Sequence, residues 1–282
     1  DVYKRQILMN KNMSKHNALN MFGRSGNPAM NDATFSNFTP ESIVPGQTMT
    51  LQGTVNKTGI LLLLVMITAT YTWNQFFSTG LPETVMPIAI GGAIFGFGFA
   101  LATIFKKTWA PVTAPLYALS QGLFLGAISA IFELQFPGIV IQAVGLTMGT
   151  LASLLVLYKT GIIKPTENFR LMIVSATMGI ALLYIVSMVM NMLGSSGIGF
   201  IHSNGLFGIG FSLFVVAIAA LNLVLDFDFI EQGSEQGAPK YMEWFGAFSL
   251  MVTLIWLYLE MLRLLAKLRS CLLYTSDAAD ES

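Results

Sequence analysis

The sequence predicts an all-α integral membrane protein with seven transmembrane helices. Of its 282 residues, 54% are hydrophobic and 11% are charged, and the mean hydropathy is +0.65. A soluble protein carries about a quarter charged residues, so these charges are too few to cover a soluble surface. The apolar residues also form long runs of about 20, the length that a helix needs to cross the hydrocarbon core. Runs this long and uninterrupted indicate helices and not barrel strands.

The seven apolar runs account for most of the chain. Residues 7–56 precede them and are predicted to form a polar, flexible amino-terminal arm, because they show no sustained apolar period. The transmembrane domain is predicted to cover residues 57–269. Short polar breaks divide it into helices at 59–77, 84–105, 111–132, 138–158, 170–193, 204–225 and 244–265. Glycines three or four residues apart in the second and third runs allow close helix packing.

Both ends of the chain are expected to be foreign to the protein. Residues 1–6 and the start of residues 271–282 can be encoded by inverted copies of one DNA string, as in the adapters of transposase-based sequencing libraries. Both segments are therefore interpreted as adapter scars and left out of the fold prediction, with a natural terminal tail as the alternative. Without them, 13 basic and 11 acidic residues remain and the single cysteine, Cys271, is lost.

This composition excludes several classes of function. A nearly balanced charge gives no basic surface, so nucleic acid is not a predicted partner. One cysteine is too few for a disulfide framework or a thiolate metal site. The length leaves room for the helices and no large soluble domain, so the bilayer itself is the predicted environment.

Basic residues between the helices predict the orientation. They fall in alternate breaks, at Lys57, Lys106, Lys107, Lys159, Lys164, Arg170 and Lys240. Because the positive side of a membrane protein is normally cytoplasmic, the amino terminus is predicted to be cytoplasmic. Arg263, Lys267 and Arg269 conflict with this pattern, since seven helices place them at the other side. Either these side chains snorkel from a helix that ends late, or one span is re-entrant and both termini are cytoplasmic.

Two carboxylates near the last two helices are the main site prediction. Asp226 lies at the end of the sixth run, one helical turn after Asn222, and Glu260 lies deep in the seventh. Ionisable groups in a span usually mark a pathway, a partner or a site. The alternatives are a solvated helix end for Asp226 and an intrahelical ion pair with Arg263 for Glu260.

Two further carboxylates are secondary candidates. Asp228 follows Asp226 by two residues and is expected to be more solvated, and Glu133 closes the third run as a residue at the membrane rim. Two facing carboxylates in a low dielectric would share a proton or hold a cation, so Asp226 and Glu260 would form a pH-responsive site. Oxygen ligands without cysteine favour a hard cation such as calcium.

No enzyme chemistry is predicted. A retinal protein needs a lysine deep in the seventh helix, but Lys267 stands at the end of that run. His202 adjoins Ser203 in a polar break, where a catalytic dyad is poorly placed. Zinc-protease and nucleotide-binding motifs are absent from the sequence, and no cofactor is expected. An enzyme would need an unrecognised site among Glu133, His202 and Asp228.

Three phrases carry a family resemblance: QGLFLGAISAIFE at 121–133, LDFDFIEQG at 225–233 and LYLEMLRLL at 257–265. Together they resemble the Bax inhibitor 1 / YccA family, over about residues 45–268 and in its bacterial branch with an extended polar arm. The resemblance implies a central seventh helix surrounded by the other six. It also implies a pair of carboxylates that senses pH in a calcium leak pathway, at the positions of Asp226 and Glu260. Glu260 departs from the family pattern, which has an aspartate there.

The resemblance therefore implies a pH-sensitive calcium leak in the bacterial inner membrane. Calcium or protons would be the transported ions, and protonation of the Asp226–Glu260 pair would bias the packing of the seventh helix. The alternative is a non-conducting regulator that binds a membrane protease or another quality-control partner, and in that case the polar arm would matter.

Overall fold

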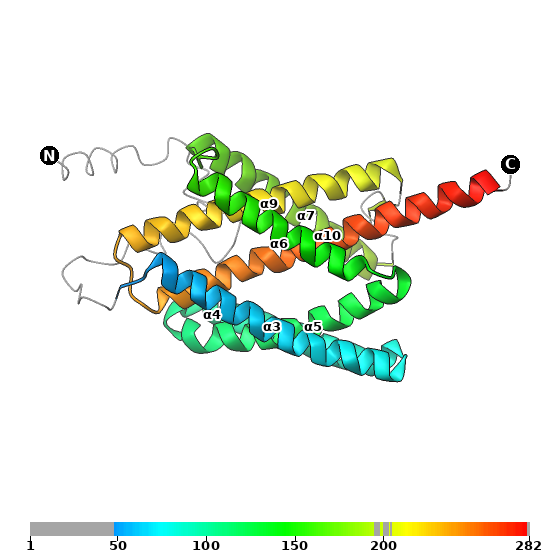
Figure 1. The fold of residues 1–282 in the computed structure, drawn as a ribbon, viewed down its shortest axis with the longest axis horizontal. Coiled ribbons are helices and arrows are strands. Elements are labelled where there is room, and N and C mark those ends of the chain that lie inside the picture. Colours follow the sequence, from blue (N-terminus) through cyan, green and yellow to red (C-terminus); the bar gives the residue numbers. More distant parts are fainter. Residues whose placement is uncertain (1–47, 195–197, 200–202, 204, 281–282) are drawn as a thin grey trace.

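The computed structural model describes residues 48–194, 198–199, 203 and 205–280, with side chains as far as residue 271. These residues form one antiparallel bundle of long helices, shown in Figure 1. In chain order the elements are α3 (Leu51–Thr79), α4 (Pro82–Phe105), the short 3-10 helix η3 (Lys107–Trp109), α5 (Ala110–Gln135), α6 (Ile139–Lys159), α7 (Glu167–Met192), α9 (Leu206–Glu235) and α10 (Met242–Asp280). Seven of them are long and apolar enough to cross a membrane, which confirms the predicted fold class.

The bundle has two ends of different character. At the basic end lie the start of α3, η3 and the connections 160–166 and 236–241, and this end carries the lysines of the predicted cytoplasmic side. At the opposite end the chain turns through glycines with positive φ, such as Gly80 at 68° and Gly138 at 81°. Glycine adopts this backbone conformation without the steric strain that a Cβ atom would introduce.

The seventh transmembrane helix, α10, occupies the centre, as the family resemblance implies. Its apolar stretch is 72% buried inside the bundle, compared with at most 56% for any other helix. It packs against α3, α5, α6 and α9, whereas α4 lies outside against α5 and α3, and α7 lies outside against α9. Figure 1 shows α10 running from the basic end to the opposite end. It is unbroken, so no re-entrant segment interrupts this span.

Small residues bring α3 and α5 close together. A Cβ atom placed on Gly126 would lie 2.4 Å from the carbonyl oxygen of Ala69, which is much closer than two such atoms can approach. Glycine is therefore required at this crossing, as the spacing of small residues in the third run predicted.

The helix boundaries differ from the predicted ones by more than three residues at three places. First, α3 begins at Leu51, within the predicted arm, because Thr50 caps its first turn by accepting a hydrogen bond from the Gly53 N–H. Second, α9 continues to Glu235, ten residues past the predicted end at 225, because its carboxylates find partners inside the bundle. Third, α10 continues past 265 to Asp280, so the predicted seventh helix was too short.

Candidate functional site

Asp226 does not lie at a helix end. It is fully buried in α9, nine residues before the helix ends, so the alternative of a solvated carboxylate is wrong. Its Oδ2 accepts a hydrogen bond of 2.6 Å from the Thr253 hydroxyl on α10. Asn222, one turn earlier, is also buried, and its amide donates to the Thr177 hydroxyl on α7 at 2.8 Å. Polar contacts thus tie this part of α9 to α7 and to α10.

Glu260 is buried in α10 and takes part in a three-residue cluster. Its Oε1 accepts hydrogen bonds from the Tyr184 hydroxyl on α7 at 3.0 Å and from Arg263 at 2.5 Å. Arg263 also donates to the Tyr184 oxygen at 2.8 Å, and its guanidinium lies over the Tyr184 ring. The predicted intrahelical ion pair is therefore present. The second carboxylate oxygen, Oε2, is buried and has no hydrogen-bond partner among the described residues.

The two predicted carboxylates have different partners. Asp226 binds Thr253, which precedes Glu260 by seven residues, or about 10 Å along the helix axis. Among the described residues, no group of three or more His, Cys, Asp or Glu side chains could hold a metal ion. Both carboxylates are buried, Asp226 with a hydrogen bond to α10 and Glu260 with hydrogen bonds to α7 and to Arg263 of its own helix.

A third polar residue of α10 extends this arrangement. Lys267 is 5% exposed, and its ammonium donates to the Gly208 carbonyl at 3.0 Å and to the Ser212 hydroxyl at 2.8 Å, both on α9. The hydropathy of the seventh run predicts Lys267 at the end of the helix. That placement is wrong, because α10 continues beyond it and α9 supplies buried acceptors.

Thr253, Glu260 and Lys267 are spaced seven residues apart, so they lie along one face of α10, and we call them the α10 polar stripe. A spacing of seven residues is close to two helical turns, with a drift of about 20° for each repeat. The α10 polar stripe covers about 21 Å of a hydrocarbon core that is about 30 Å thick. Every member binds a polar group on α7 or α9. The sequence signal was the heptad spacing of polar residues in an apolar helix, and it was missed.

Two other carboxylates of α9, those of Asp228 and Glu231, form contacts at the basic end. Asp228 accepts hydrogen bonds from Arg170 of α7 at 2.5 Å and from Gln232 at 2.6 Å, so it is an ion-pair partner. Glu231, one turn after Phe227, accepts a hydrogen bond from the Tyr158 hydroxyl of α6. These pairs explain how α9 extends beyond its apolar part, because each carboxylate is compensated by a donor from a neighbouring helix.

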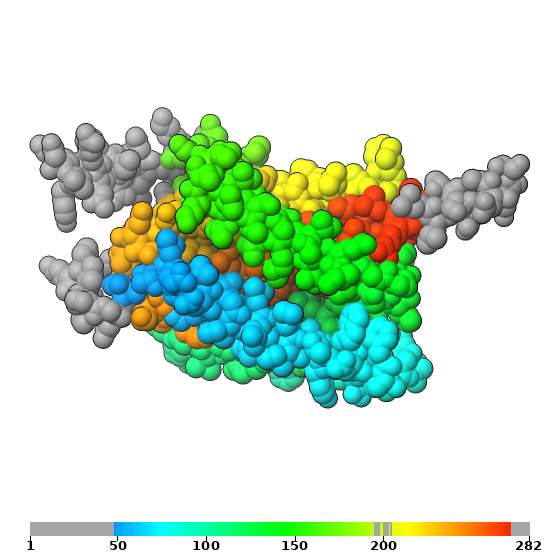
Figure 2. Space-filling view, in the orientation of Figure 1, coloured from blue at the N-terminus to red at the C-terminus, as the bar shows by residue number. Residues whose placement is uncertain are grey.

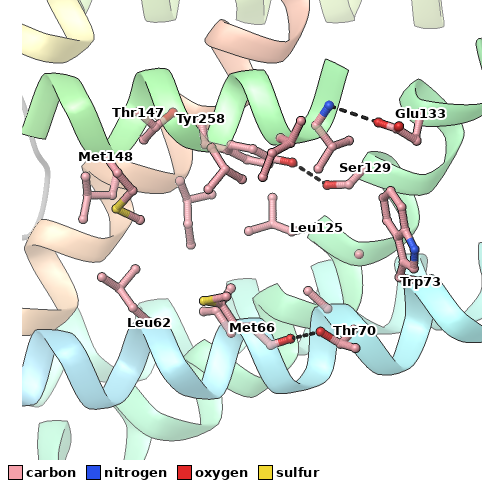
Figure 3. A pocket seen from close by; sticks show the side chains of 18 of the residues that line it. Leu62, Met66, Thr70, Trp73, Leu125, Ser129, Glu133, Thr147, Met148 and Tyr258 are labelled. Carbon is pink, nitrogen blue, oxygen red and sulfur yellow. Dashed lines mark hydrogen bonds between the residues drawn. The ribbon is translucent and has the colours of Figure 1, made fainter. Parts of the chain in front are cut away.

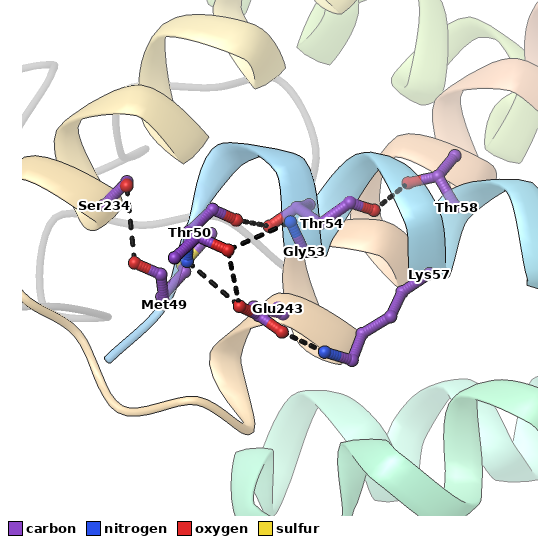
Figure 4. Close-up of polar contacts among 8 residues, drawn as sticks. All are labelled: Met49, Thr50, Gly53, Thr54, Lys57, Thr58, Ser234 and Glu243. Carbon is purple, nitrogen blue, oxygen red and sulfur yellow. Dashed lines mark hydrogen bonds and ion pairs between the residues drawn. The ribbon is translucent and has the colours of Figure 1, made fainter. Parts of the chain in front are cut away.

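At the same end, the start of α10 is bonded to the start of α3 (Figure 4). Glu243 is 1% exposed, and its carboxylate accepts hydrogen bonds from the Thr50 N–H at 3.0 Å and the Thr50 hydroxyl at 2.9 Å, and forms an ion pair with Lys57. Just before this point, the Met49 N–H donates to the Ala238 carbonyl at 2.6 Å. The chain therefore enters the bundle beside the α9–α10 connection.

Glu133 has a local structural role at the opposite end. Its two carboxylate oxygens accept hydrogen bonds from the N–H groups of Gly138 at 2.5 Å and Val140 at 3.1 Å. It thus satisfies donors at the start of α6, as carboxylates at helix amino termini commonly do. His202 lies outside the described residues.

The basic residues of the last helix, which conflicted with the positive-inside pattern, all bind acceptors of the protein. Arg263 binds Glu260, and Lys267 binds α9, as described above. Arg269 donates to the Pro137 carbonyl at 2.7 Å and to the Gln142 side chain at 2.9 Å. Their positions at the opposite end are therefore explained by local partners.

A comparison with protein families gives a match over most of the chain. The model described as Bax inhibitor 1 like matches residues 9–270, a segment that contains Asp226 and Glu260. The match starts after residues 1–6 and stops before residue 271, so neither terminal segment contributes to it. No curated protein and no solved structure matches the chain.

Proposed function

Because the chain belongs to the Bax inhibitor 1-like family, we propose that it is a pH-sensitive leak for cations, with calcium as the transported ion. The observation that carries the proposal is the α10 polar stripe, which crosses most of an apolar bundle and is paired with buried polar groups of α7 and α9. Intramembrane ionisable groups are costly, and they typically line ion pathways. In this proposal Asp226 and Glu260 are two successive carboxylates of one path.

The described arrangement fits a closed path. Arg263 and Lys267 place two cationic groups near Glu260, and like charges oppose the entry of a cation. Glu260 holds Arg263 through an ion pair, although no residue in the described part of the chain binds its other oxygen, Oε2. A buried oxygen without a hydrogen-bond donor is costly, so in this proposal Oε2 is a ligand for the passing cation.

Protonation of Glu260 would open the path in this proposal. A neutral Glu260 loses the charge that holds Arg263, whose side chain is already 38% exposed and can turn towards the membrane surface. Removal of that cation lowers the barrier for calcium, so we expect flux to rise on acidification. The basic end would face the cytoplasm of a bacterial inner membrane, in accordance with the positive-inside rule.

The test is calcium flux into liposomes over a range of pH, measured with a trapped calcium dye. Glu260→Gln mimics the protonated side chain, so we expect a high flux that no longer depends on pH. The increase at neutral pH should be about tenfold or more, because a barrier change of about 1.4 kcal/mol gives that factor. Asp226→Asn should reduce flux at acidic pH by removing the other carboxylate.

Glu83→Gln is the matched control, since Glu83 is an exposed carboxylate at the opposite end. It should behave as the wild type. Unchanged flux and unchanged pH dependence in both Glu260→Gln and Asp226→Asn would refute the leak.

A second candidate function is a regulator that binds a membrane protease. The observation in its favour is the anchoring of residues 48–50 to the α9–α10 connection and to Glu243 of α10. A partner that binds the preceding arm would act directly beside the central helix.

This alternative is tested by deleting residues 7–47, which leaves the anchored residues in place. Loss of co-purification with a membrane protease, while calcium flux is retained, would support the regulator. A deletion of residues 1–6 alone is the control. Equal co-purification after the long deletion would count against this function.

A further inference from the structure

A large apolar cavity lies on the side of α10 that faces away from α9. Its volume is about 620 Å³, and it is lined by α3, α5, α6 and α10. Figure 3 shows Leu62, Met66 and Trp73 along α3 on one side and Met148 of α6 on the other. Figure 2 shows the surface of the bundle hollowed between α3 (blue to cyan) and α6 (green). We call this cavity the lateral groove.

The lateral groove opens towards the lipid. Residues at its mouth belong to the outer face of the bundle, where Met66 is 65% exposed and Ile141 is 73% exposed. Exposed apolar side chains of this kind face hydrocarbon in a transmembrane helix. Molecules that reach the groove from this side come from the bilayer and not from water.

The interior of the lateral groove offers little to water. The Ser129 and Tyr258 hydroxyls bind each other at 2.6 Å, and Thr70 and Thr147 bind backbone carbonyls of their own helices. The Glu133 carboxylate is occupied by the start of α6. A buried water needs two to four polar partners, whereas an apolar cavity of only about 150 Å³ already takes up benzene. The chemistry of the lining therefore favours a hydrocarbon.

The length and position of the lateral groove fit one lipid chain. On α3 it extends from Leu62 to Asn74, about 18 Å along the helix axis. One leaflet contributes about half of the ~30 Å hydrocarbon core. Asn74 and Glu133 lie near the ends of their helices at the opposite end of the bundle, and Leu62 and Met148 lie near mid-membrane. The groove thus spans a single leaflet, with its polar rim at the membrane surface.

We propose that the lateral groove binds one acyl chain of a phospholipid from the leaflet at the opposite end of the bundle. The acyl chain enters between α3 and α6 and contacts Leu254, Ile255 and Tyr258 of α10. It therefore touches the central helix that carries the α10 polar stripe, but the binding itself does not depend on any ion leak. The volume lies within the range of about 300–1,000 Å³ that is usual for small-molecule sites.

The test compares two tryptophan substitutions on α6. Val144 lines the lateral groove, so the larger side chain of Val144→Trp fills the groove. Val156 is 60% exposed and lies outside the groove, so Val156→Trp is the matched control. Each protein is reconstituted in equal parts of palmitoyl-oleoyl phosphatidylethanolamine and phosphatidylglycerol, extracted in mild detergent and measured by native mass spectrometry. The wild type and Val156→Trp should retain one phospholipid. Val144→Trp should lose most of it, a reduction of several-fold.

Three results of this experiment would overturn the proposal. A wild type without a retained phospholipid would show that the groove binds none, and equal retention by Val144→Trp would place the lipid elsewhere. A wild-type dimer that Val144→Trp dissociates would instead identify a second copy of the chain as the occupant, which also contradicts the proposal.

A second measurement uses only the wild-type chain and so does not depend on the folding of any variant. A phosphatidylcholine with a photoreactive diazirine in its acyl chain is added to the reconstituted protein and crosslinked by light. We expect labelled peptides at Leu125, Ser129 or Tyr258, which lie inside the groove. Labelling confined to outward residues such as Ile94 and Phe97, which are both 65% exposed, would refute the acyl-chain site.

Discussion

The ion pair between Lys57 of α3 and Glu243 of α10 predicts which of its two partners costs more stability when it is replaced. Glu243 is 1% exposed, whereas the Lys57 side chain is 16% exposed. The two partners are therefore not equivalent. Without Lys57, a buried carboxylate remains with only the two hydrogen bonds from Thr50. Without the charge of Glu243, the lysine remains, and its long side chain can reach towards water.

The expected costs follow from this difference. Lys57→Met should lower the free energy of unfolding by about 3–5 kcal/mol, the cost of leaving one partner of a buried pair uncompensated. It also removes the contact of the ammonium with the Trp244 ring, at 5.5 Å. Glu243→Gln retains an oxygen that accepts from Thr50, so its cost should be about 1–2 kcal/mol. The double variant should be more stable than Lys57→Met alone, because it no longer buries an unpaired charge.

Thermal unfolding in detergent, followed by tryptophan fluorescence, measures these differences. Domains of about this size lose roughly 2–4 °C in Tm for each kcal/mol. Lys57→Met should therefore lower Tm by about 10 °C and Glu243→Gln by about 5 °C. Lys240→Met is the matched control, because Lys240 is exposed at the same end, and it should leave Tm unchanged. If Glu243→Gln is as destabilising as Lys57→Met, the explanation based on unequal burial is wrong.

Three further substitutions test the packing of the bundle by the same assay. Gly126→Ala should destabilise the protein by about 1–3 kcal/mol or more, because its Cβ atom would lie 2.4 Å from a backbone oxygen of α3. Gly98→Ala is the control, since no atom lies within 4 Å of its added Cβ. It should be neutral or slightly stabilising. Equal effects of the two alanines would contradict the close approach of α3 and α5. Tyr258→Phe removes the hydroxyl that binds Ser129 and should cost about 0.6 kcal/mol and no more than about 1.7 kcal/mol, the average and the maximum for hydrogen bonds between transmembrane helices. A loss much above this range would mean that the pair has a further structural role.

The number and order of the helices could be predicted from the sequence because hydropathy depends on each residue alone. A run of about 20 apolar residues is long enough to cross a bilayer whatever its neighbours are. Prediction from hydropathy fails where polar residues are buried with partners from another helix. The sixth run was predicted to end at 225 because carboxylates begin there, but α9 continues to Glu235. Arg170 and Tyr158, from two other helices, compensate these carboxylates.

The contacts of the candidate site could not be predicted because they depend on the register between helices. Asp226 binds Thr253, 27 residues away, and Lys57 binds Glu243, 186 residues away. A rotation of α10 by one residue turns its side chains by about 100°, which would remove these contacts without changing any hydropathy value. The family resemblance placed Asp226 and Glu260 at the same interface, but it could not give the separate partners that each has in the structure.

The position of α10 gives the proposed leak and the proposed lipid site a common physical basis. One face of this helix carries the α10 polar stripe, and another carries the apolar floor of the lateral groove. Tyr258 stands two residues before Glu260, so a displacement of α10 that alters the contacts of one face also alters those of the other. Ligands shift such an equilibrium only by the difference in their affinity for the two arrangements. An acyl chain that binds the lateral groove more tightly in the closed arrangement should therefore reduce the opening that protonation causes. Val144→Trp displaces this acyl chain and should remove the reduction, so the pH dependence of its calcium flux should differ from that of the wild type.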